Sequence, residues 1–352
     1  MRKLILDGKT IQDDGNAYVI AEIGHNHQGD LETAKKMFRI AKECGADAVK
    51  LQKRNNRKLY TKAAYDGPYD NRNSYGSTYG QHREALEFGK VAYRELFDYA
   101  RELGITMFST AFDFESADFL AEFNTPAFKI ASGDVKNIPL LTHIAKLQKP
   151  MVLSTGGATM EDVNRAYDAI MPLNDQLVIL QCTAGYPADF HELNLNVITT
   201  FRERFPNTVI GLSSHDNGIA MAIAAYKLGA RVIEKHFTLN HTLKGTDHAF
   251  SLDPSVLIKM VRVLHRCREA MGDGVKKVYE TELLPIMKMG KKMVAARDLP
   301  AGHAVQPEDI VFKSPGDSLP PYEFDKVVGR TTLCDLKADE NLTFKVLNGA
   351  TK

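Results

Sequence analysis

The sequence predicts an α/β protein that consists of a closed (β/α)8 barrel, the TIM-barrel fold, followed by a small β-rich domain. Eight short apolar runs alternate with amphipathic stretches between Tyr18 and Met271. The runs are nearly continuous in apolar and β-branched residues, which is typical of strands that are buried on both faces. The main alternative is a doubly wound sheet. Eight strand–helix units and the absence of a Gly-x-Gly-x-x-Gly motif after the first run favour the barrel.

The predicted strands follow one another at the spacing that βα units require. They are Tyr18–Ile23, Ala48–Gln52, Thr106–Thr110, Ala127–Ser132, Met151–Thr155, Leu177–Thr183, Val209–His215 and Val232–Thr238.

Helix start and stop signals separate these runs. Asp30 precedes an apolar repeat that begins at Leu31, and Gly104 ends the helix that contains ELFDYAREL. Asn137 with Pro139 begins another helix, and Thr159-x-x-Asp162 resembles a capping box. Asp253 followed by Pro254 is an N-cap with proline at the first helical position.

One connection is unusually long. The chain between Gln52 and about Tyr93 is polar and rich in tyrosine and glycine. A loop of this length inside a compact domain is usually functional or disordered. Its several tyrosines argue against disorder, so we expect a functional loop.

The pattern changes after about Met271. Residues 272–285 (GDGVKKVYETELLP) are typical of a linker, and strand-like runs separated by turns begin at Lys291. The predicted domains are therefore 1–280, the barrel, and 281–352, the β-rich domain. The β-rich part is near the lower size limit for a self-supporting core, so we expect it to pack on the barrel or on a second chain.

Composition excludes several classes of function. The 352 residues include 45 Lys plus Arg and 44 Asp plus Glu, a net charge of +1, which argues against binding nucleic acid through bulk charge. The four cysteines are far apart and form no Cys-x-x-Cys pair, as expected in a reducing compartment. The N-terminal apolar stretch is too short for a signal peptide, and no run is long enough to span a membrane. We therefore expect a cytoplasmic protein.

Polar residues gather where the predicted strands end, which is where barrel enzymes place their active sites. Lys50 and Lys129 lie within two of these strands, and a buried lysine is costly without an anionic partner. With the nearby hydroxyls they favour a site for a small polyanion. The alternative is that each lysine forms a structural ion pair with Glu22, Glu234 or Asp134.

His215 and His236 end the last two predicted strands. Two imidazoles there could ligate a divalent metal and leave positions open for water and substrate. The alternative is two hydrogen-bonded core histidines. Asp247 and His248, just past the last strand, are further candidates. His25 and His27 follow the first strand, where either a metal site or a turn network explains them.

Several motifs carry a resemblance to a known family. The segments AEIGHNHQGDLETAKKMFRIAKECGADAVKLQK, FKIASGD, LSTGG, LQCTAGYP, GLSSHDNGIAMAIAAYKLGARVIEKHFT and KGTDHAFSLDP together resemble the sialic acid synthases (N-acylneuraminate synthases). The C-terminal AARDLPAGHAV and KSPGDSLPP resemble the antifreeze-like (SAF) domain that closes those enzymes. The tyrosine-rich loop looks like that of the animal-type branch, which makes the 9-phosphate.

The resemblance implies a reaction. The family condenses phosphoenolpyruvate with an N-acylated aminohexose, such as N-acetylmannosamine or its 6-phosphate, to give a nine-carbon α-keto acid and phosphate. The alternative within the family is a synthase for another nonulosonic acid, of the legionaminic, pseudaminic or KDN type. An alternative of another class is a non-catalytic sugar-binding SAF protein.

The resemblance also implies roles for individual residues and a homodimer in which the SAF domain reaches the partner's barrel. Manganese or magnesium would bind His215 and His236, and Glu22 or Asp134 would transfer protons. Phosphoenolpyruvate would contact Lys50, Thr110, Lys129, Ser132, Ser154 and Ser213. The sugar would contact Glu22, Gln52, Asp134, Tyr186 and Asp247. The chain departs from the family at Ala184 and Ser314, where some members carry Asn and Arg.

Overall fold

The chain divides into two compact units in a computed structural model that describes residues 1–349. The first unit is Met1–Gly272, and the second begins at Asp273. The division therefore falls before the predicted boundary at residue 280. Part of the predicted linker is helical, because α12 (Glu280–Met289) begins within it. The Glu282 side chain accepts a hydrogen bond from the Tyr279 backbone N–H at 2.8 Å, which caps the first turn.

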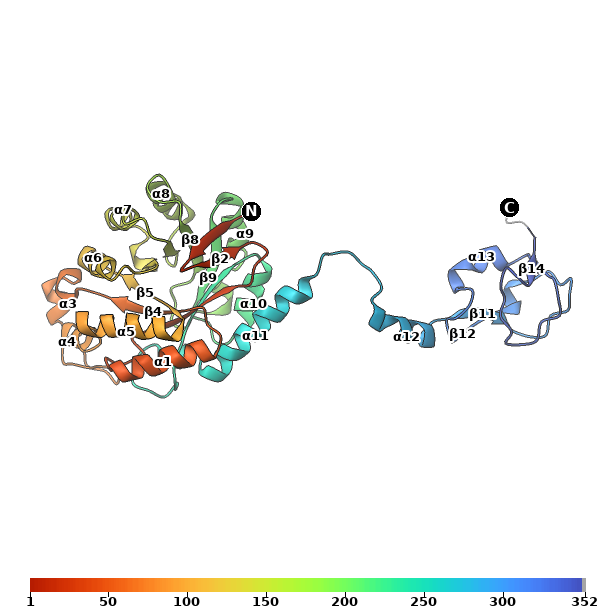
Figure 1. Ribbon diagram of the computed structural model, residues 1–352, viewed down its shortest axis with the longest axis horizontal. Coiled ribbons are helices and arrows are strands. Elements are labelled where there is room, and N and C mark those ends of the chain that lie inside the picture. The colour runs from red at the N-terminus through yellow and green to blue at the C-terminus, as the bar shows by residue number, and fades with distance from the viewer. Residues whose placement is uncertain (350–352) are drawn as a thin grey trace. The chain divides into compact units, whose positions relative to one another are not determined.

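The first unit is the predicted barrel, with helices around a closed sheet of parallel strands (Figure 1). The order around the barrel is β10-β3-β4-β5-β6-β7-β8-β9, so the first and last strands of the barrel pair and close it. All eight predicted strands are present. They are β3 (Tyr18–Gly24), β4 (Ala48–Lys53), β5 (Thr106–Ala111), β6 (Phe128–Ile130), β7 (Met151–Ser154), β8 (Leu177–Cys182), β9 (Val209–Ser214) and β10 (Val232–His236).

Helices follow each barrel strand, and every predicted start signal is confirmed. Asp30, Asn137 and Asp253 accept hydrogen bonds as N-caps, and Thr159 with Asp162 forms a capping box. The α-helices of this unit are α1 (Leu31–Glu43), α2 (Asn56–Leu59), α3 (Lys62–Asp66), α4 (Tyr79–Glu84), α5 (Lys90–Leu103), α6 (Phe114–Glu122), α7 (Ile138–Ala145), α8 (Met160–Ile170), α9 (Val197–Arg204), α10 (Ala220–Lys227) and α11 (Pro254–Met271). Short 3-10 helices are η1 (Ser132–Asp134), η2 (Phe190–Glu192) and η3 (His248–Phe250).

The long connection between β4 and α5 is ordered and contains α2, α3 and α4. Its aromatic residues pack on one another: the rings of Tyr60 and Tyr79 are 5.0 Å apart, and those of Tyr69 and His82 are 4.6 Å apart. Such contacts supply the core that a polar loop of this length otherwise lacks. The tyrosines therefore have the ordering role expected from the sequence.

A hairpin that the sequence did not predict closes one end of the barrel. Strands β1 (Lys3–Leu6) and β2 (Lys9–Gln12) pair antiparallel across Asp7 and Gly8, which both have positive φ. Leu4, Leu6 and Ile11 are buried in one cluster with residues at the starts of the barrel strands. The N-terminal end of the barrel is thus filled with apolar side chains, which leaves the opposite end for a cavity.

The second unit is a small domain with its own apolar core. Its strands form two two-stranded sheets, β11 (Lys292–Ala295) with β12 (Ile310–Lys313) and β13 (Thr331–Thr332) with β14 (Leu347–Asn348). It also contains α12, α13 (Phe324–Val327), η4 (Pro307–Asp309) and η5 (Pro321–Glu323). The core comprises Met293, Ala295, Leu299, Val305, Ile310, Val327, Leu336, Leu342 and Leu347. Among residues 1–349, none of the helices has the length and apolar character that crossing a membrane requires.

Candidate active site

A cavity of about 520 Å³ lies in the first unit, lined by residues at and just beyond the carboxyl ends of the barrel strands. Twelve of the residues predicted from the sequence line it together. They are Glu22, Lys50, Gln52, Thr110, Lys129, Ser132, Ser154, Tyr186, Ser213, His215, His236 and Asp247. Parallel strands that close into a barrel bring their ends to one mouth, so residues far apart in the chain meet there.

Asp134 is the exception. It is absent from the lining of the cavity. Its carboxylate accepts a hydrogen bond from the Asn137 side-chain amide at 3.3 Å, beside the start of α7. The 3-10 turn at Ser132–Asp134 brings Ser132 to the cavity and Asp134 to the following helix. The structure does not support the predicted catalytic and sugar-binding roles of Asp134.

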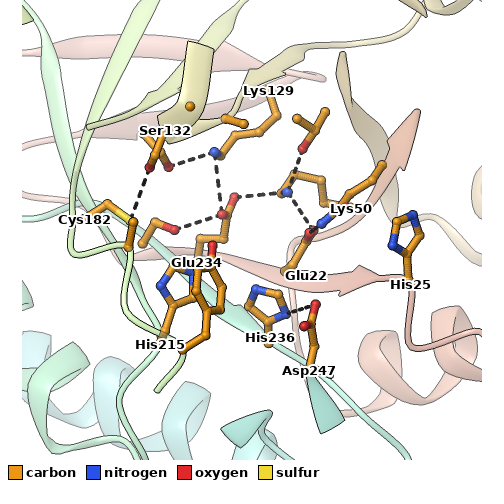
Figure 2. A pocket seen from close by; sticks show the side chains of 18 of the residues that line it. Glu22, His25, Lys50, Lys129, Ser132, Cys182, His215, Glu234, His236 and Asp247 are labelled. Carbon is orange, nitrogen blue, oxygen red and sulfur yellow. Dashed lines mark hydrogen bonds and ion pairs between the residues drawn. The ribbon is translucent and has the colours of Figure 1, made fainter. Parts of the chain in front are cut away.

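Lys50 is held by a carboxylate and a hydroxyl (Figure 2). Its Nζ lies 2.7 Å from Glu22 Oε2 and donates to Thr110 Oγ1 at 3.0 Å. Glu234 Oε2 lies 3.9 Å away on the other side. All of these side chains are buried, which strengthens each charge interaction.

Lys129 occupies the matching position on the other side of Glu234 (Figure 2). Its Nζ donates to Ser154 Oγ at 2.7 Å and to the Ile130 carbonyl at 2.9 Å. It lies 3.8 Å from Glu234 Oε1, which also accepts a 3.0 Å hydrogen bond from Ser213. The alternative of structural ion pairs is therefore realised in this chain, within the same cavity that the anion-binding hypothesis requires.

The buried carboxyl groups of Glu22 and Glu234 differ in pKa. Burial raises the pKa of Glu22; the charge of Lys50 offsets part of that increase, and the charge of Glu234 adds to it. Burial would also raise the pKa of Glu234, but Lys129 and Lys50 outweigh it and lower that pKa. Two neighbouring acids whose pKa values separate in this way suit proton transfer, and Glu22 is the more easily protonated of the two.

His215 and His236 lie side by side in the cavity, with ring centroids 5.3 Å apart (Figure 2). The His215 Nδ1–H donates to the Thr183 carbonyl at 2.9 Å, which leaves Nε2 as the lone-pair nitrogen. Burial, followed by the neighbouring His236, lowers the pKa of His215 to about 4. The ring is therefore neutral at physiological pH, the form that ligates metals.

The donor set fits a divalent cation that keeps several of its own water ligands. His236 Nδ1 is buried without a hydrogen-bond partner, and Asp247 Oδ2 is 3.6 Å from it. Within the part of the chain that the structure describes, no group of three or more His, Cys, Asp or Glu side chains could hold a metal. Two imidazoles would therefore share a cation with water or substrate, as in open catalytic sites.

Among the lining residues that were not assigned to the site from the sequence, four carry a charged or imidazole side chain: His25, Arg54, Arg83 and Glu234. Glu234 was recognised at a strand end but only as an ion-pair partner. Arg54 directly follows β4, so its place at a strand end could have assigned it to the cavity. Nothing in the sequence indicates that Arg83 lies there. His27, by contrast, fits the turn explanation, because its Nδ1 accepts from the Gly29 N–H at 3.0 Å.

The fold and this cavity together define a (β/α)8-barrel enzyme whose reactive groups lie at the carboxyl ends of the strands. Comparison with known proteins then identifies its family. The chain belongs to the NeuB family, the sialic acid synthases: the family model matches residues 37–276, and the SAF domain model matches residues 293–347. The resemblance stated from the sequence is confirmed.

Relatives cover nearly the whole chain. The N-acetylneuraminate-9-phosphate synthase of Homo sapiens is 39% identical over 336 residues, 95% of this chain and 94% of that protein. The N,N'-diacetyllegionaminic acid synthase of Legionella pneumophila is 36% identical over 335 residues, 93% of this chain and 94% of that protein. The crystal structure of the sialic acid synthetase of Leptospira borgpetersenii in complex with citrate matches with a TM-score of 0.70 and 29% identity, covering 81% of this chain and 95% of that one.

Proposed function

We propose that this enzyme condenses phosphoenolpyruvate with N-acetylmannosamine or its 6-phosphate, giving N-acetylneuraminate or its 9-phosphate, and phosphate. The observation that carries the proposal is a single cavity that holds two buried lysines, the hydroxyls of the serines and threonine assigned to phosphoenolpyruvate, and an adjacent pair of histidines. Relatives named as N-acetylneuraminate-9-phosphate synthases support the reaction.

The lysines and hydroxyls suit phosphoenolpyruvate, which carries a phosphate and a carboxylate. Lys129 with Ser132 and Ser154 would bind one anionic group, and Lys50 with Thr110 the other. The anion would then replace part of the pairing that Glu22 and Glu234 now provide. Burial keeps water away and increases the strength of these contacts.

His215 and His236 would hold a Mn²⁺ or Mg²⁺ ion. When bound, such an ion supplies Lewis acidity to a carbonyl oxygen. The unpartnered nitrogen of His236 and the fixed tautomer of His215 support this assignment.

Glu22 is the proton carrier in our proposal. C3 of phosphoenolpyruvate bonds to the aldehyde carbon of the open-chain sugar, and the aldehyde oxygen takes the proton of Glu22. Water adds to C2 and gives a proton back to the Glu22 carboxylate. The C2–O bond to phosphate then breaks with its electron pair going to the phosphate. The C2 hydroxyl gives its proton to the departing phosphate, and a ketone remains at C2.

A second copy of the chain completes our proposal. Apolar side chains of α12 are exposed, namely Leu283, Leu284, Ile286, Met287 and Met289. A run of this kind is typical of an interface, and it supports a domain-swapped homodimer in which the second unit reaches the partner's barrel. Four free cysteines fit the reducing, cytoplasmic location that we also propose.

The test is phosphate release from phosphoenolpyruvate with N-acetylmannosamine, its 6-phosphate, mannose 6-phosphate and a diamino-hexose offered in parallel with Mn²⁺ or Mg²⁺. We expect release with one or both N-acetylmannosamine forms. Release only with the diamino-hexose would assign a legionaminic or pseudaminic acid synthase, and release only with mannose 6-phosphate a KDN-type enzyme. No release with any sugar would favour the non-catalytic sugar-binding protein.

A further inference from the structure

Two arginines and a histidine form one wall of the cavity, on the side away from Lys129 and Ser132. Arg54 and Arg83 both line the cavity and both contact His25. Arg54 Nη1 lies 2.9 Å from His25 Nε2, and Arg83 Nη1 lies 3.3 Å from His25 Nδ1. Figure 2 shows His25 on the opposite side of the cavity from Ser132 and Cys182. The arginine wall is thus separate from the Lys129–Ser132 side.

The groups around His25 offer more hydrogen-bond donors than acceptors. A neutral imidazole has one acceptor nitrogen, yet a guanidinium N–H group faces each of its two nitrogens. Burial, then Arg54 and Arg83, holds the pKa of His25 well below its usual value, so the ring does not gain a second proton. One arginine N–H therefore meets another N–H and lacks an acceptor.

Neighbouring groups do not neutralise this wall. Glu87 Oε1 is 4.0 Å from Arg54 Nη1, but its other oxygen already binds Lys53 at 2.9 Å. Asp247 lines the cavity, and its charge acts on Arg83. Three cations, Lys53, Arg54 and Arg83, thus face two carboxylates. The Arg54 side chain is only 7% exposed, and its Nε has no hydrogen-bond partner.

Aromatic rings hold both guanidinium groups by their faces. The Arg54 guanidinium lies 3.8 Å from the Phe112 ring centroid, and that of Arg83 lies 4.9 Å from the Tyr79 centroid. Arg83 also donates from Nε and Nη2 to the Tyr79 hydroxyl at 2.9 and 2.7 Å. These contacts fix both guanidinium groups before a ligand binds, which reduces the entropy lost on binding. They leave the Nη1 groups that face His25 as donors for an oxyanion.

A short chain of hydrogen bonds connects this wall to the residues expected to face the sugar. Arg54 Nη2 donates to Gln52 Oε1 at 2.6 Å, and Gln52 Nε2 donates to Glu22 Oε1 at 2.7 Å. Gln52, Glu22 and Asp247 are the residues assigned to the acceptor. A group bound at Arg54 and Arg83 would therefore belong to the far end of the sugar.

We propose that Arg54 and Arg83 form a second anion subsite, which binds the phosphate monoester of a 6-phosphorylated acceptor sugar. This inference rests on the proposed function and selects the phosphorylated acceptor from its two forms. The subsite needs a ligand with several acceptor oxygens, which the unphosphorylated sugar lacks at that end.

The experiment compares kcat/KM for N-acetylmannosamine 6-phosphate and for N-acetylmannosamine in the parent, Arg83→Met, Arg83→Lys and Arg54→Lys. We expect the parent to prefer the 6-phosphate, and Arg83→Met to reduce that preference about 10- to 100-fold. Arg83→Lys should retain part of this preference, because lysine keeps the positive charge but lacks the planar, multiple-donor geometry of the guanidinium group. The KM for phosphoenolpyruvate should stay within about twofold. Arg101→Met, an exposed arginine on α5, is the matched control and should leave every value unchanged.

Two further measurements separate the outcomes. Calorimetry of the 6-phosphate without phosphoenolpyruvate should show binding to the parent that is lost in Arg83→Met, and thermal unfolding checks that each variant is folded. Equal loss for both acceptors, or a parent that prefers the unphosphorylated sugar, would overturn the subsite while phosphate release upholds the proposed function. If neither sugar leads to phosphate release, the proposed function is wrong. Calorimetry then tests by itself whether Arg83 binds the 6-phosphate. Inorganic phosphate that binds through Arg83 with no change in acceptor preference would assign the subsite to free phosphate and overturn our assignment.

Discussion

Lys235 and Asp216 form a buried ion pair directly behind the two histidines of the active site. Lys235 Nζ lies 2.9 Å from Asp216 Oδ1 and donates to the Asp216 carbonyl at 2.6 Å. Each residue adjoins one of the histidines in the sequence, and side chains alternate along a strand. The pair therefore connects β10 with the residue that follows His215, outside the lining of the cavity, and we expect it to hold the His215 and His236 rings in place.

We predict that Asp216→Asn destabilises the protein by about 3 kcal/mol, because it leaves the ammonium of Lys235 buried without a countercharge. Metal affinity should fall about 10- to 100-fold, since the ring positions are no longer fixed. Urea unfolding and Mn²⁺ titration measure the two effects. Asp98→Asn, which breaks the exposed pair with Arg101, is the control and should change stability by less than about 1 kcal/mol. An Asp216→Asn protein with the parent's metal affinity would contradict the positioning role.

His215→Ala and His236→Ala should each abolish metal-dependent turnover, a loss of at least about 1000-fold if the metal supplies about 4 kcal/mol. Chelation of the parent enzyme should give the same loss, and added Mn²⁺ should reverse it. The measurement is phosphate release with and without metal. His143→Ala removes a histidine on α7 that pairs with Asp118 at the surface, and it should behave as the parent. Near-normal activity in either active-site variant would disprove the shared metal site.

The sequence alone locates the residues that depend on strand position. Lys50, Lys129, His215 and His236 were placed correctly in one cavity, because the carboxyl end of each barrel strand is readable from its apolar run. Helix caps such as Asp253 could also be predicted, because a capping hydrogen bond joins residues only three positions apart in the sequence.

Some residues whose position depends on a loop or turn were missed or misplaced. Arg83 comes from α4 in the long connection, and only the tertiary fold brings it to His25. The family resemblance implied a site role for Asp134, but a 3-10 turn directs its carboxylate to Asn137. The hairpin at Asp7 and Gly8 had a signal, an Asp-Gly pair between two short strands, that was not used.

Acid should destabilise the barrel through His27. This ring is buried, stacks on Phe88 with centroids 4.3 Å apart, and has its pKa lowered by burial to about 3. Because the unfolded pKa is about 6.5, the unfolded chain binds the proton more tightly. Stability is therefore complete above about pH 6.5 and decreases as the pH falls toward 3. At pH 5, about 1.5 units below the unfolded value, the loss is about 2 kcal/mol.

His27→Gln should remove this contribution, so its unfolding free energy should change about 2 kcal/mol less than the parent's between pH 7 and pH 5. Urea unfolding at both pH values gives the comparison. The exposed His143→Gln should keep the parent's dependence. The parent's His27 can also be titrated by NMR, so the prediction stands if the variant does not fold. A folded-state pKa near 6.5, or identical pH dependence in parent and variant, would refute it.

The exposed face of α12 predicts how the enzyme assembles. Leu283 and Leu284 are 58% and 67% exposed on a helix that also carries exposed Ile286 and Met287. Burial of a leucine contributes about 1.5–3 kcal/mol. The free energy gained when a second chain covers these residues would therefore be enough for a stable dimer. We therefore expect the full chain to be dimeric by sedimentation, Leu284→Glu to shift it toward monomer, and Lys288→Glu on the same helix to remain dimeric.

Loss of the second unit tests whether that dimer matters for catalysis. A chain that ends at Tyr279 keeps the whole first unit with its own core, so it should fold. It lacks the segment proposed to reach the partner's barrel, so we expect a monomer with kcat/KM for the sugar reduced about tenfold or more. The KM for phosphoenolpyruvate should change far less, because the residues assigned to that substrate all belong to the barrel. Full activity in such a monomer would show that the second unit contributes nothing to the partner's active site.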